Sequence, residues 1–510
     1  MPACEIGMSP PSKVSNRMRP LISAILVTLC LVSSVDAIAE AAGAADAGQV
    51  VRTEGEAFIQ SGGADGMSIA MVRDGRMQFF NFGTIVRGKA QTPDKNTVYE
   101  IGSISKTFAS LLLAHALVEK KAGAADDMRR YLPGQYPNLE YQGGPVTLAN
   151  LASTTSALPD NLPDLTEARK KADPKDEAFV VAELLNGYSE KRFFEDLHKV
   201  SLVDKPGNMP RHSNVAAALL ADIVAKLYGR PYDELLAAYI EKPLGIQSGV
   251  AKARMSKMAT GYAEGDTVAP AFNAPYLVAA GGLRYSADDM ARYIVAQLNA
   301  DDPAIGLTQQ PAWGDVESQA IGFNWILAKT VDSQRRLSHG GGTFGFSSFV
   351  DMYPDSRYGI VFLVNRSRRS TQGQLEQMSM RIKDGIFGRP AVTDALELAL
   401  SRQGYGDVDA VVRQVRGNHP ELFLSEPYVN AWGYRLLQGG HAKDAVKMFE
   451  YNTQCFPKSW NAYDSLAEAF AVTGDVKGSI ANYRRSLEMN SANMHAKGEL
   501  AKLEKPAAGH

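Results

Sequence analysis

Ser103 and Lys106 lie three positions apart, at the start of a largely apolar run that is typical of a buried helix. On a helix this spacing places both side chains on the same face. A serine hydroxyl is a poor nucleophile until a neighbouring group accepts its proton, and a lysine amine within reach can accept it. The helix N-terminus also offers N–H groups to an acyl oxygen that becomes anionic. The pair therefore indicates covalent, acyl-enzyme chemistry.

The same pair also has a purely structural interpretation. Ser-x-x-Lys is expected by chance about twice in a chain of this size. Ser103 would then cap the helix, and Lys106 would be a solvated residue of its first turn. Other motifs have to decide between the two interpretations.

Two further stretches carry residues that can assist a nucleophile. His212 and Asn214 stand just before an expected helix, and His339 precedes three glycines at 340–342, ahead of an expected strand. Imidazole accepts and donates protons near neutral pH. Glycine leaves the backbone bare, so a substrate can approach N–H donors closely.

In this order and at these separations, Ser-x-x-Lys, x-Ser-Asn and His-Gly-Gly resemble the motifs of the serine penicillin-recognising hydrolases. That family includes class C β-lactamases, low-molecular-weight DD-peptidases and related esterases. The resemblance covers roughly residues 50–388. It implies that Ser103 is the acylated nucleophile and that Lys106 is its proton acceptor or relay.

The resemblance also implies the substrate-binding residues. Asn214 would hold the amide of the substrate, and His339 would stand in for the cationic member of the third motif. Gly341 and Gly342 would line the bound substrate. The backbone N–H groups of Ser103 and Gly342 would form the oxyanion hole, with each donor contributing about 3 kcal/mol.

One position departs from the family pattern. Class C enzymes and their DD-peptidase relatives place a tyrosine where this chain has His212. An imidazole can shuttle a proton to the leaving group in place of the phenol. The alternative is that His212 is structural and the enzyme weakened. His339 has a structural alternative too, because the glycines alone could serve the oxyanion.

Two classes of function are therefore expected. The first is an exported serine hydrolase that acts on D-Ala-D-Ala type peptides, β-lactams or related amides and esters. Among these substrates, peptidase-like or β-lactamase-like action is favoured, and the loop at 151–159 is most similar to that of cell-wall DD-peptidases. The second is a catalytically weakened or inactive scaffold that binds a protein partner through C-terminal repeats.

Composition and charge limit the partners. The chain of 510 residues is 45% hydrophobic and 22% charged, with a formal net charge of -2. This balance gives no support to nucleic-acid binding. The histidines show no metal-ligand spacing, and neither a metal nor a cofactor is expected. His115 is expected to be a core residue within the apolar helix.

The N-terminus has the pattern of a secretory signal. An apolar run of roughly 15 residues, Leu21–Val35, follows two arginines and ends at small residues. We expect residues 1–39 to be a cleaved signal peptide and the mature protein to be periplasmic or secreted, without a transmembrane segment. Cys455 is then the only thiol of the mature chain, which leaves no intramolecular disulfide.

Strand patterns flank a long helical stretch, which predicts an α+β fold: an antiparallel sheet covered by helices, with an all-helical insertion. The resemblance implies the same β-lactamase/DD-peptidase-like fold. A hairpin is expected at 67–82 with Asp-Gly in its turn, and a second at 347–365. Another strand is expected at 323–328. We place the hydrolase domain at 45–390 and expect the ligand cleft where the sheet meets the insertion.

Residues 391–510 form the second predicted domain, which is helical only. Gly440 recurs as Gly474 and Phe449 as Tyr483, a period of about 34 residues. That period resembles the tetratricopeptide repeat (TPR), whose concave face usually binds peptide or protein. The repeats would stack with neighbouring helices, and the alternative is two unrelated amphipathic hairpins.

Three arginines, Arg366, Arg368 and Arg369, follow the last expected strand. Bidentate contacts from a guanidinium could hold a substrate carboxylate. We favour the simpler interpretation of a solvated basic loop.

Overall fold

The computed structural model describes residues 47–250 and 252–504. The chain divides into two compact units, residues 1–53 and residues 54–510, and the architecture below is that of the second. The expected signal peptide at 1–39 lies outside the described residues. No helix among the described residues is long and apolar enough to cross a membrane.

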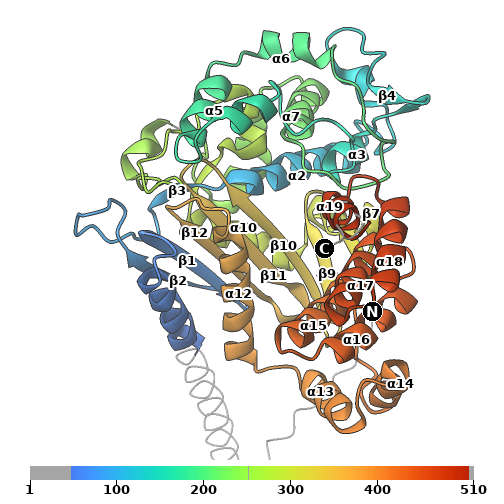
Figure 1. The fold of residues 1–510 in the computed structure, drawn as a ribbon. Helices are drawn as coiled ribbons and strands as arrows, with labels where there is room; N and C mark the ends of the chain where they lie inside the picture. Colours follow the sequence, from blue (N-terminus) through green and yellow to red (C-terminus); the bar gives the residue numbers. More distant parts are fainter. Residues whose placement is uncertain (1–46, 251, 505–510) are drawn as a thin grey trace, which may run out of the picture. The chain divides into compact units, whose positions relative to one another are not determined.

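An eight-stranded antiparallel sheet forms the centre of the α+β part of the chain, with the strand order β2-β1-β12-β11-β10-β9-β8-β7 (Figure 1). Early and late strands therefore share one sheet, as expected. The strands are β1 (Gly66–Arg73), β2 (Arg76–Gly83), β7 (Trp313–Asp315), β8 (Gln319–Ile321), β9 (Ile326–Lys329), β10 (Arg335–Gly342), β11 (Ser347–Tyr353) and β12 (Tyr358–Val364).

Both predicted hairpins are confirmed. Asp74 and Gly75 turn β1 into β2 with positive φ angles of 52° and 76°, the conformation that two-residue hairpin turns require. The turn between β11 and β12 contains Pro354–Ser356. β1 closes onto β12, with Met67 opposite Val364. The strand expected at 323–328 begins later, at Ile326.

Helices cover both faces of the sheet. The helix α12 (Thr371–Phe387) lies on one face, where Ser379 Oγ donates to Asp351 of β11 at 2.8 Å. The helix α10 (Ala287–Asn299) packs on the opposite face, and Ile294 occupies the space beside Gly359 of β12 (Figure 1). Neighbouring strand residues point to opposite faces, which lets one strand contact both helices.

The insertion between β3 (Val98–Glu100) and β6 (Arg284–Ser286) is mostly helical, and these two strands pair with each other. The nucleophile segment precedes α2 (Ser105–Val118), a helix buried on nearly all sides. His115 of α2 is largely buried, as expected. The other helices of eight or more residues in this insertion are α5 (Glu177–Asn186), α6 (Glu190–Leu197) and α7 (Asn214–Tyr228), the first and last as predicted.

The region after α12 is all helical. Its helices pair in sequence order: α13 (Ala391–Gln403) with α14 (Val408–Asn418), α15 (Glu426–Gln438) with α16 (Ala442–Cys455), and α17 (Trp460–Thr473) with α18 (Val476–Met489), followed by α19 (Met494–Leu503). Gly440 and Gly474 follow the first helix of their pairs with positive φ. Phe449 and Tyr483 are both buried. The helical hairpins with a 34-residue spacing fit a TPR-like arrangement.

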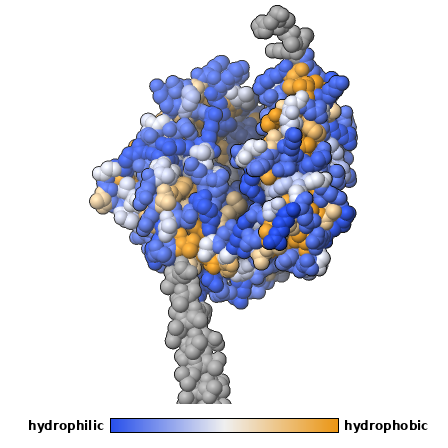
Figure 2. Space-filling model, turned by 60° about the horizontal axis from the view of Figure 1, so that its bottom comes forward, coloured by the Kyte–Doolittle hydropathy of each residue, from blue (hydrophilic) through white to orange (hydrophobic). Residues whose placement is uncertain are grey.

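Hydrophobic side chains on the face drawn in Figure 2 form several separate patches in a mainly hydrophilic surface. Within the helical hairpins the most exposed of the large hydrophobic residues are Val472 and Met494, at 61% and 73%. Scattered exposed hydrophobic residues are normal on soluble proteins.

Candidate active site

Ser103 and Lys106 are in direct contact. Ser103 sits in a single 3-10 turn, Gly102–Ile104, that leads into α2, and the Nζ atom of Lys106 lies 2.9 Å from its Oγ atom. No side chain caps α2, and Lys106 is only 2% exposed. The interpretation of a capping serine beside a solvated lysine is therefore wrong.

Two further acceptors surround the amine of Lys106. Nζ donates to Oδ1 of Asn214 at 2.8 Å and to the carbonyl oxygen of Ala280 at 2.7 Å. Neither oxygen can donate a hydrogen bond. When the amine is neutral, its two N–H bonds go to these oxygens, and its lone pair faces Ser103.

The protonation of Lys106 suits this role. Burial lowers the pKa of Lys106 to about 7, although the charge of Asp160 acts in the opposite direction. Near neutral pH a substantial fraction of the amine is therefore unprotonated and able to accept the Ser103 proton.

His212 stands on the other side of the nucleophile. Its Nε2 atom lies 3.4 Å from Ser103 Oγ, and its Nδ1 atom lies 2.6 Å from Oδ1 of Asp160. Such a long contact to the nucleophile is common in a site without substrate. The imidazole is thus placed within reach of a proton at the nucleophile, which favours the catalytic interpretation over the structural one.

Asn214 is held by the start of α7. Ser213 caps this helix by accepting a hydrogen bond from the N–H of Ala216. The side-chain amide of Asn214 donates from Nδ2 to Oδ1 of Asn161 at 2.9 Å. Its Oδ1 atom therefore points at Lys106, and the predicted contact of Asn214 with the substrate amide stays a prediction.

The glycine motif forms the end of β10 and precedes β11, the first strand of the hairpin expected at 347–365. A Cβ atom on Gly341 would lie 2.1 Å from the carbonyl oxygen of Ile101, so only glycine fits beside the nucleophile turn. Gly342 lies at the end of β10, against the backbone of Gly102. The first and third motifs are therefore in backbone contact.

His339 is on the same face of β10 as Gly341. Its Nδ1–H group donates to the carbonyl oxygen of Gly340 at 2.6 Å. Burial, the charge of Lys106 and the proximity of His212 lower the pKa of His339 to about 3. This pKa argues against a cation at His339 in the site without substrate, and the substrate-binding role of His339 stays a prediction.

Three participants were missed by the sequence analysis: Asp160, Asn161 and the carbonyl group of Ala280. Asp160 and Asn161 directly follow the loop at 151–159 that carried part of the family resemblance. An Asp-Asn pair next to that loop was the available signal, but spacing alone does not connect it to His212.

A cavity of about 570 Å³ opens beside this site. Its lining includes Asp160, Asn161, Arg169 and Lys199, from the insertion alone. The cleft expected between the sheet and the insertion is therefore not this cavity, although Asp160 borders it. Within the described part of the chain, no group of three or more His, Cys, Asp or Glu side chains is placed to hold a metal ion.

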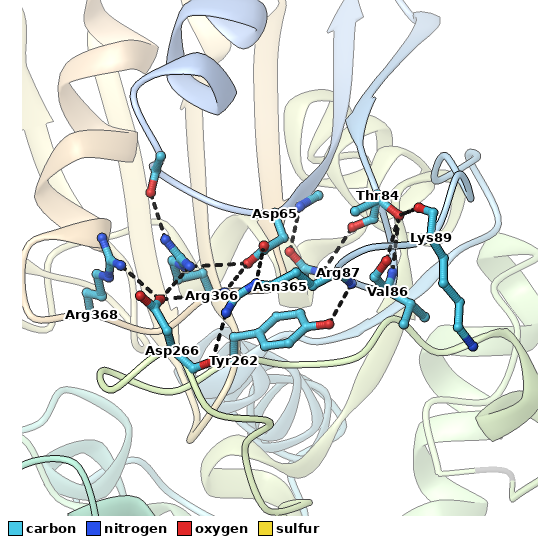
Figure 3. Close-up of polar contacts among 12 residues, drawn as sticks. Asp65, Thr84, Val86, Arg87, Lys89, Tyr262, Asp266, Asn365, Arg366 and Arg368 are labelled. Carbon is cyan, nitrogen blue, oxygen red and sulfur yellow. Dashed lines mark hydrogen bonds and ion pairs between the residues drawn. The ribbon is translucent and has the colours of Figure 1, made fainter.

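Arg366 and Arg368, which follow β12, belong to an ion-pair network (Figure 3). Arg366 is only 7% exposed, and its guanidinium contacts Asp65 at 3.3 Å and Asp266 at 2.5 Å. Arg368 also binds Asp266, at 2.9 Å. For Arg366, both the substrate-carboxylate role and the solvated loop are therefore wrong.

Comparisons with known proteins agree with this geometry. The family model described as Beta-lactamase matches residues 46–382. The D-alanyl-D-alanine-carboxypeptidase/endopeptidase AmpH of Escherichia coli strain K12 is 26% identical over 366 residues, which are 68% of this chain and 91% of the relative. A beta-lactamase of Pseudomonas fluorescens is 24% identical over 364 residues, covering 64% of this chain and 95% of the relative.

Among solved structures, the beta-lactamase/D-alanine carboxypeptidase from Yersinia pestis complexed with citrate superposes with a TM-score of 0.56 at 21% identity. The superposition covers 67% of this chain and 98% of that one. At this identity the likeness shows a shared fold.

Proposed function

The chain belongs to the beta-lactamase family, and on this premise we propose that it is an exported serine hydrolase acting through an acyl-enzyme at Ser103. Its substrates are D-Ala-D-Ala type peptides, β-lactams or related amides and esters. The observation that carries the proposal is the 2.9 Å contact between Lys106 Nζ and Ser103 Oγ. The amine also donates to Oδ1 of Asn214 and to the carbonyl oxygen of Ala280, which hold it in this position.

Acylation follows from this geometry. Ser103 Oγ attacks the carbonyl carbon of the substrate while its proton passes to the neutral amine of Lys106. The carbonyl oxygen becomes anionic and receives the backbone N–H groups of Ser103 and Gly342. The tetrahedral intermediate then expels the leaving nitrogen or oxygen, which takes a proton from the site, and an ester at Ser103 remains.

Deacylation reverses these proton movements. A water molecule attacks the ester carbonyl and gives its proton to a base of the site, and the bond to Ser103 Oγ breaks. Ser103 regains a proton, and the free acid leaves. The rate of this step separates a peptidase, which a β-lactam blocks for long periods, from a β-lactamase, which turns it over.

Among the substrates we favour peptide action. The relative from Escherichia coli is a D-alanyl-D-alanine-carboxypeptidase/endopeptidase, and the resemblance of the loop at 151–159 supports the same activity. Durable labelling of Ser103 by a fluorescent penicillin supports the peptidase. Rapid hydrolysis of nitrocefin supports the β-lactamase.

The alternative is a binding protein whose hydrolase fold no longer acts, with the repeats holding a protein partner. The buried residues Phe449 and Tyr483 recur at a spacing of 34 residues, as in TPR-like repeats. The concave face of such repeats usually binds peptide or protein, which supports a binding role for that part. The preformed contact between Ser103 and Lys106 argues against loss of activity, because a protein that only binds a partner does not require a lysine amine beside a serine hydroxyl.

Mass spectrometry of the intact protein separates the two functions. After exposure to a fluorophosphonate or a β-lactam, we expect one adduct on the wild type and none on Ser103→Ala. The matched control Ser401→Ala, at an exposed serine, should be labelled like the wild type. An unlabelled wild type would favour the scaffold.

We also propose the organisation that accompanies this activity. Residues 1–39 act as a signal peptide, 45–390 as the hydrolase domain and 391–510 as a TPR-like domain, and the mature protein works in the periplasm or is secreted. The TPR-like domain binds a peptide or protein partner or supports the hydrolase domain.

A further inference from the structure

Six side chains, including that of Ser103 itself, form a closed ring of hydrogen bonds. One arm of the ring runs from Ser103 through Lys106 to Oδ1 of Asn214. The other arm runs from Ser103 to Nε2 of His212. The ring contains, in order, Ser103, Lys106, Asn214, Asn161, Asp160 and His212.

Asp160 and Asn161 close the ring. Asn214 Nδ2 donates to Asn161 Oδ1 at 2.9 Å, and Asn161 Nδ2 donates to Oδ2 of Asp160 at 2.7 Å. The second carboxylate oxygen, Oδ1, accepts from Nδ1 of His212 at 2.6 Å. Asp160 is therefore the one member that binds both arms as an acceptor.

An ionised carboxylate only accepts hydrogen bonds, so it sets the direction of the bonds along each arm as far as Lys106 and His212. The single proton of Ser103 is donated to one of these two at a time. Asp160 requires the NH₂ group of Asn161 to face it, which turns Oδ1 of Asn161 towards Asn214. Asn214 must then present its own NH₂ to Asn161 and its oxygen to Lys106. On the other arm, Asp160 requires a proton on Nδ1 of His212, which leaves the Nε2 lone pair facing Ser103.

The charge state of Asp160 agrees with this role. Burial would raise the pKa of Asp160, but the hydrogen bond and charge of His212, together with the charges of Arg169 and Lys106, hold it below its ordinary value. Asp160 is therefore a carboxylate throughout the neutral range.

The backbone holds Asp160 in place independently of its side chain. Its carbonyl oxygen accepts from the N–H of Asn214 at 2.8 Å, and Ser213 Oγ donates to the carbonyl of Pro159 at 2.8 Å. Arg211 N–H donates to the carbonyl of Thr154 at 2.7 Å. The loop that carries Asp160 is thus joined along its length to the loop that carries the second motif.

From this juxtaposition we propose that Asp160 is a positioning residue that orients both proton-transferring groups, His212 and Lys106, towards Ser103. The proposal rests on the hydrolase function proposed above and deepens it. Lys106 takes the Ser103 proton during attack and passes it to Nε2 of His212, which gives it to the leaving nitrogen. The freed Nε2 then takes a proton from the deacylating water and returns it to Ser103 Oγ as the ester bond breaks.

Substrates with different leaving groups test this division of roles. The amide nitrogen of a peptide must be protonated to leave, whereas a p-nitrophenolate leaves without a proton. For Asp160→Asn we expect kcat/KM to fall about 100-fold on a D-Ala-D-Ala peptide. The fall on a p-nitrophenyl ester should be smaller by about tenfold or more, because proton donation to the leaving group is not needed.

Two matched variants accompany this experiment. Asp160→Glu keeps the charge, and we expect it to recover part of the lost peptide activity. Asp164→Asn removes the same charge four residues further along the same loop, where Asp164 accepts from Thr166, and it should behave like the wild type. Equal losses of Asp160→Asn on both substrates would overturn the proposal, because a merely structural role lowers both alike.

A readout without catalysis keeps the proposal testable if Asp160→Asn does not fold or the enzyme proves inactive. Nitrogen-15 NMR of the wild-type histidine side chains, at a pH where the imidazole is neutral, reports the tautomer of His212, assigned by its loss in His212→Gln. We expect the proton on Nδ1. A proton on Nε2 would refute the proposal, whereas a missing Ser103 adduct would refute only the hydrolase function.

Discussion

The backbones of Gly102 and Gly342 touch: a Cβ atom on Gly102 would lie 2.3 Å from the nitrogen of Gly342. Gly102 also adopts a positive φ of 54°, which residues other than glycine rarely adopt. This contact brings the nucleophile turn against the end of β10. On the proposed function, it lets two segments that are distant in the sequence offer N–H groups to one oxyanion.

We therefore expect Gly102→Ala to displace β10 from the nucleophile turn. Labelling of Ser103 by a fluorophosphonate should slow by about 100-fold or more, because the oxyanion donors no longer converge. The control Gly281→Ala should keep its labelling rate, since a Cβ there would lie 3.7 Å from the nearest backbone atom, an ordinary contact. Unchanged labelling of Gly102→Ala would contradict the role given to this contact.

The pH dependence of acylation should follow Lys106. Burial lowers its pKa to about 7, and only the neutral amine can accept the Ser103 proton. Below that pH the rate should fall about tenfold per unit, and above it the rate should level off. Single-turnover labelling from about pH 5.5 to about pH 9 brackets that pKa and measures this curve. A rate that does not change with pH across this range would show that Lys106 is not the base.

Substitution of His339 by asparagine should leave the preference for a free substrate carboxylate unchanged. The pKa of His339, lowered to about 3, makes it neutral, so it provides no charge for such a carboxylate. The amide introduced by His339→Asn is uncharged as well, and its NH₂ group can donate to the Gly340 carbonyl as Nδ1 of the imidazole does. We would compare kcat/KM for a D-Ala-D-Ala peptide and its C-terminal amide.

For each protein we take the ratio of kcat/KM on the peptide to kcat/KM on its C-terminal amide. The ratio of His339→Asn should agree with that of the wild type within about threefold. A drop of more than about tenfold confined to the carboxylate substrate would mean that substrate binding protonates His339. It would also restore the cationic role that the family resemblance implied.

The network of Figure 3 predicts a stability effect. Asp65→Asn leaves the buried guanidinium of Arg366 with only the half-exposed Asp266 as a carboxylate partner, and it also removes the 2.7 Å ion pair with Arg87. We expect the free energy of unfolding in urea to fall by about 3 kcal/mol. Asp74→Asn, at an exposed ion pair in a hairpin turn, should change it by less than about 1 kcal/mol.

Local patterns predicted the parts of the fold that local physics decides. The Asp74-Gly75 turn and the apolar runs of β1, β11 and β12 are visible in the sequence, and all three strands formed where expected. Ser103 and Lys106 met because three residues make nearly one helical turn. These features need no knowledge of the rest of the chain.

Features that depend on distant partners could not be predicted. Glycines weaken a strand, yet the glycines at 340–342 continue β10. Position 341 has to be glycine because the carbonyl oxygen of Ile101 leaves no room for a side chain there. His339 is neutral because of what surrounds it, which the family resemblance could not reveal. Asp160 gains its role only when folding brings it to His212.

The pairing of β1 with β12 has a consequence for biosynthesis. Met67 meets its partner Val364 only after almost all of the hydrolase region has been made. Until then the first hairpin exposes an unpaired, apolar edge, the kind of surface that recruits other chains. Assembly of the sheet from both ends of the sequence is also slow, because distant segments must meet. A truncated chain that stops before residue 358 would therefore keep the unpaired, aggregation-prone edge of β1, and we expect chaperones to bind it.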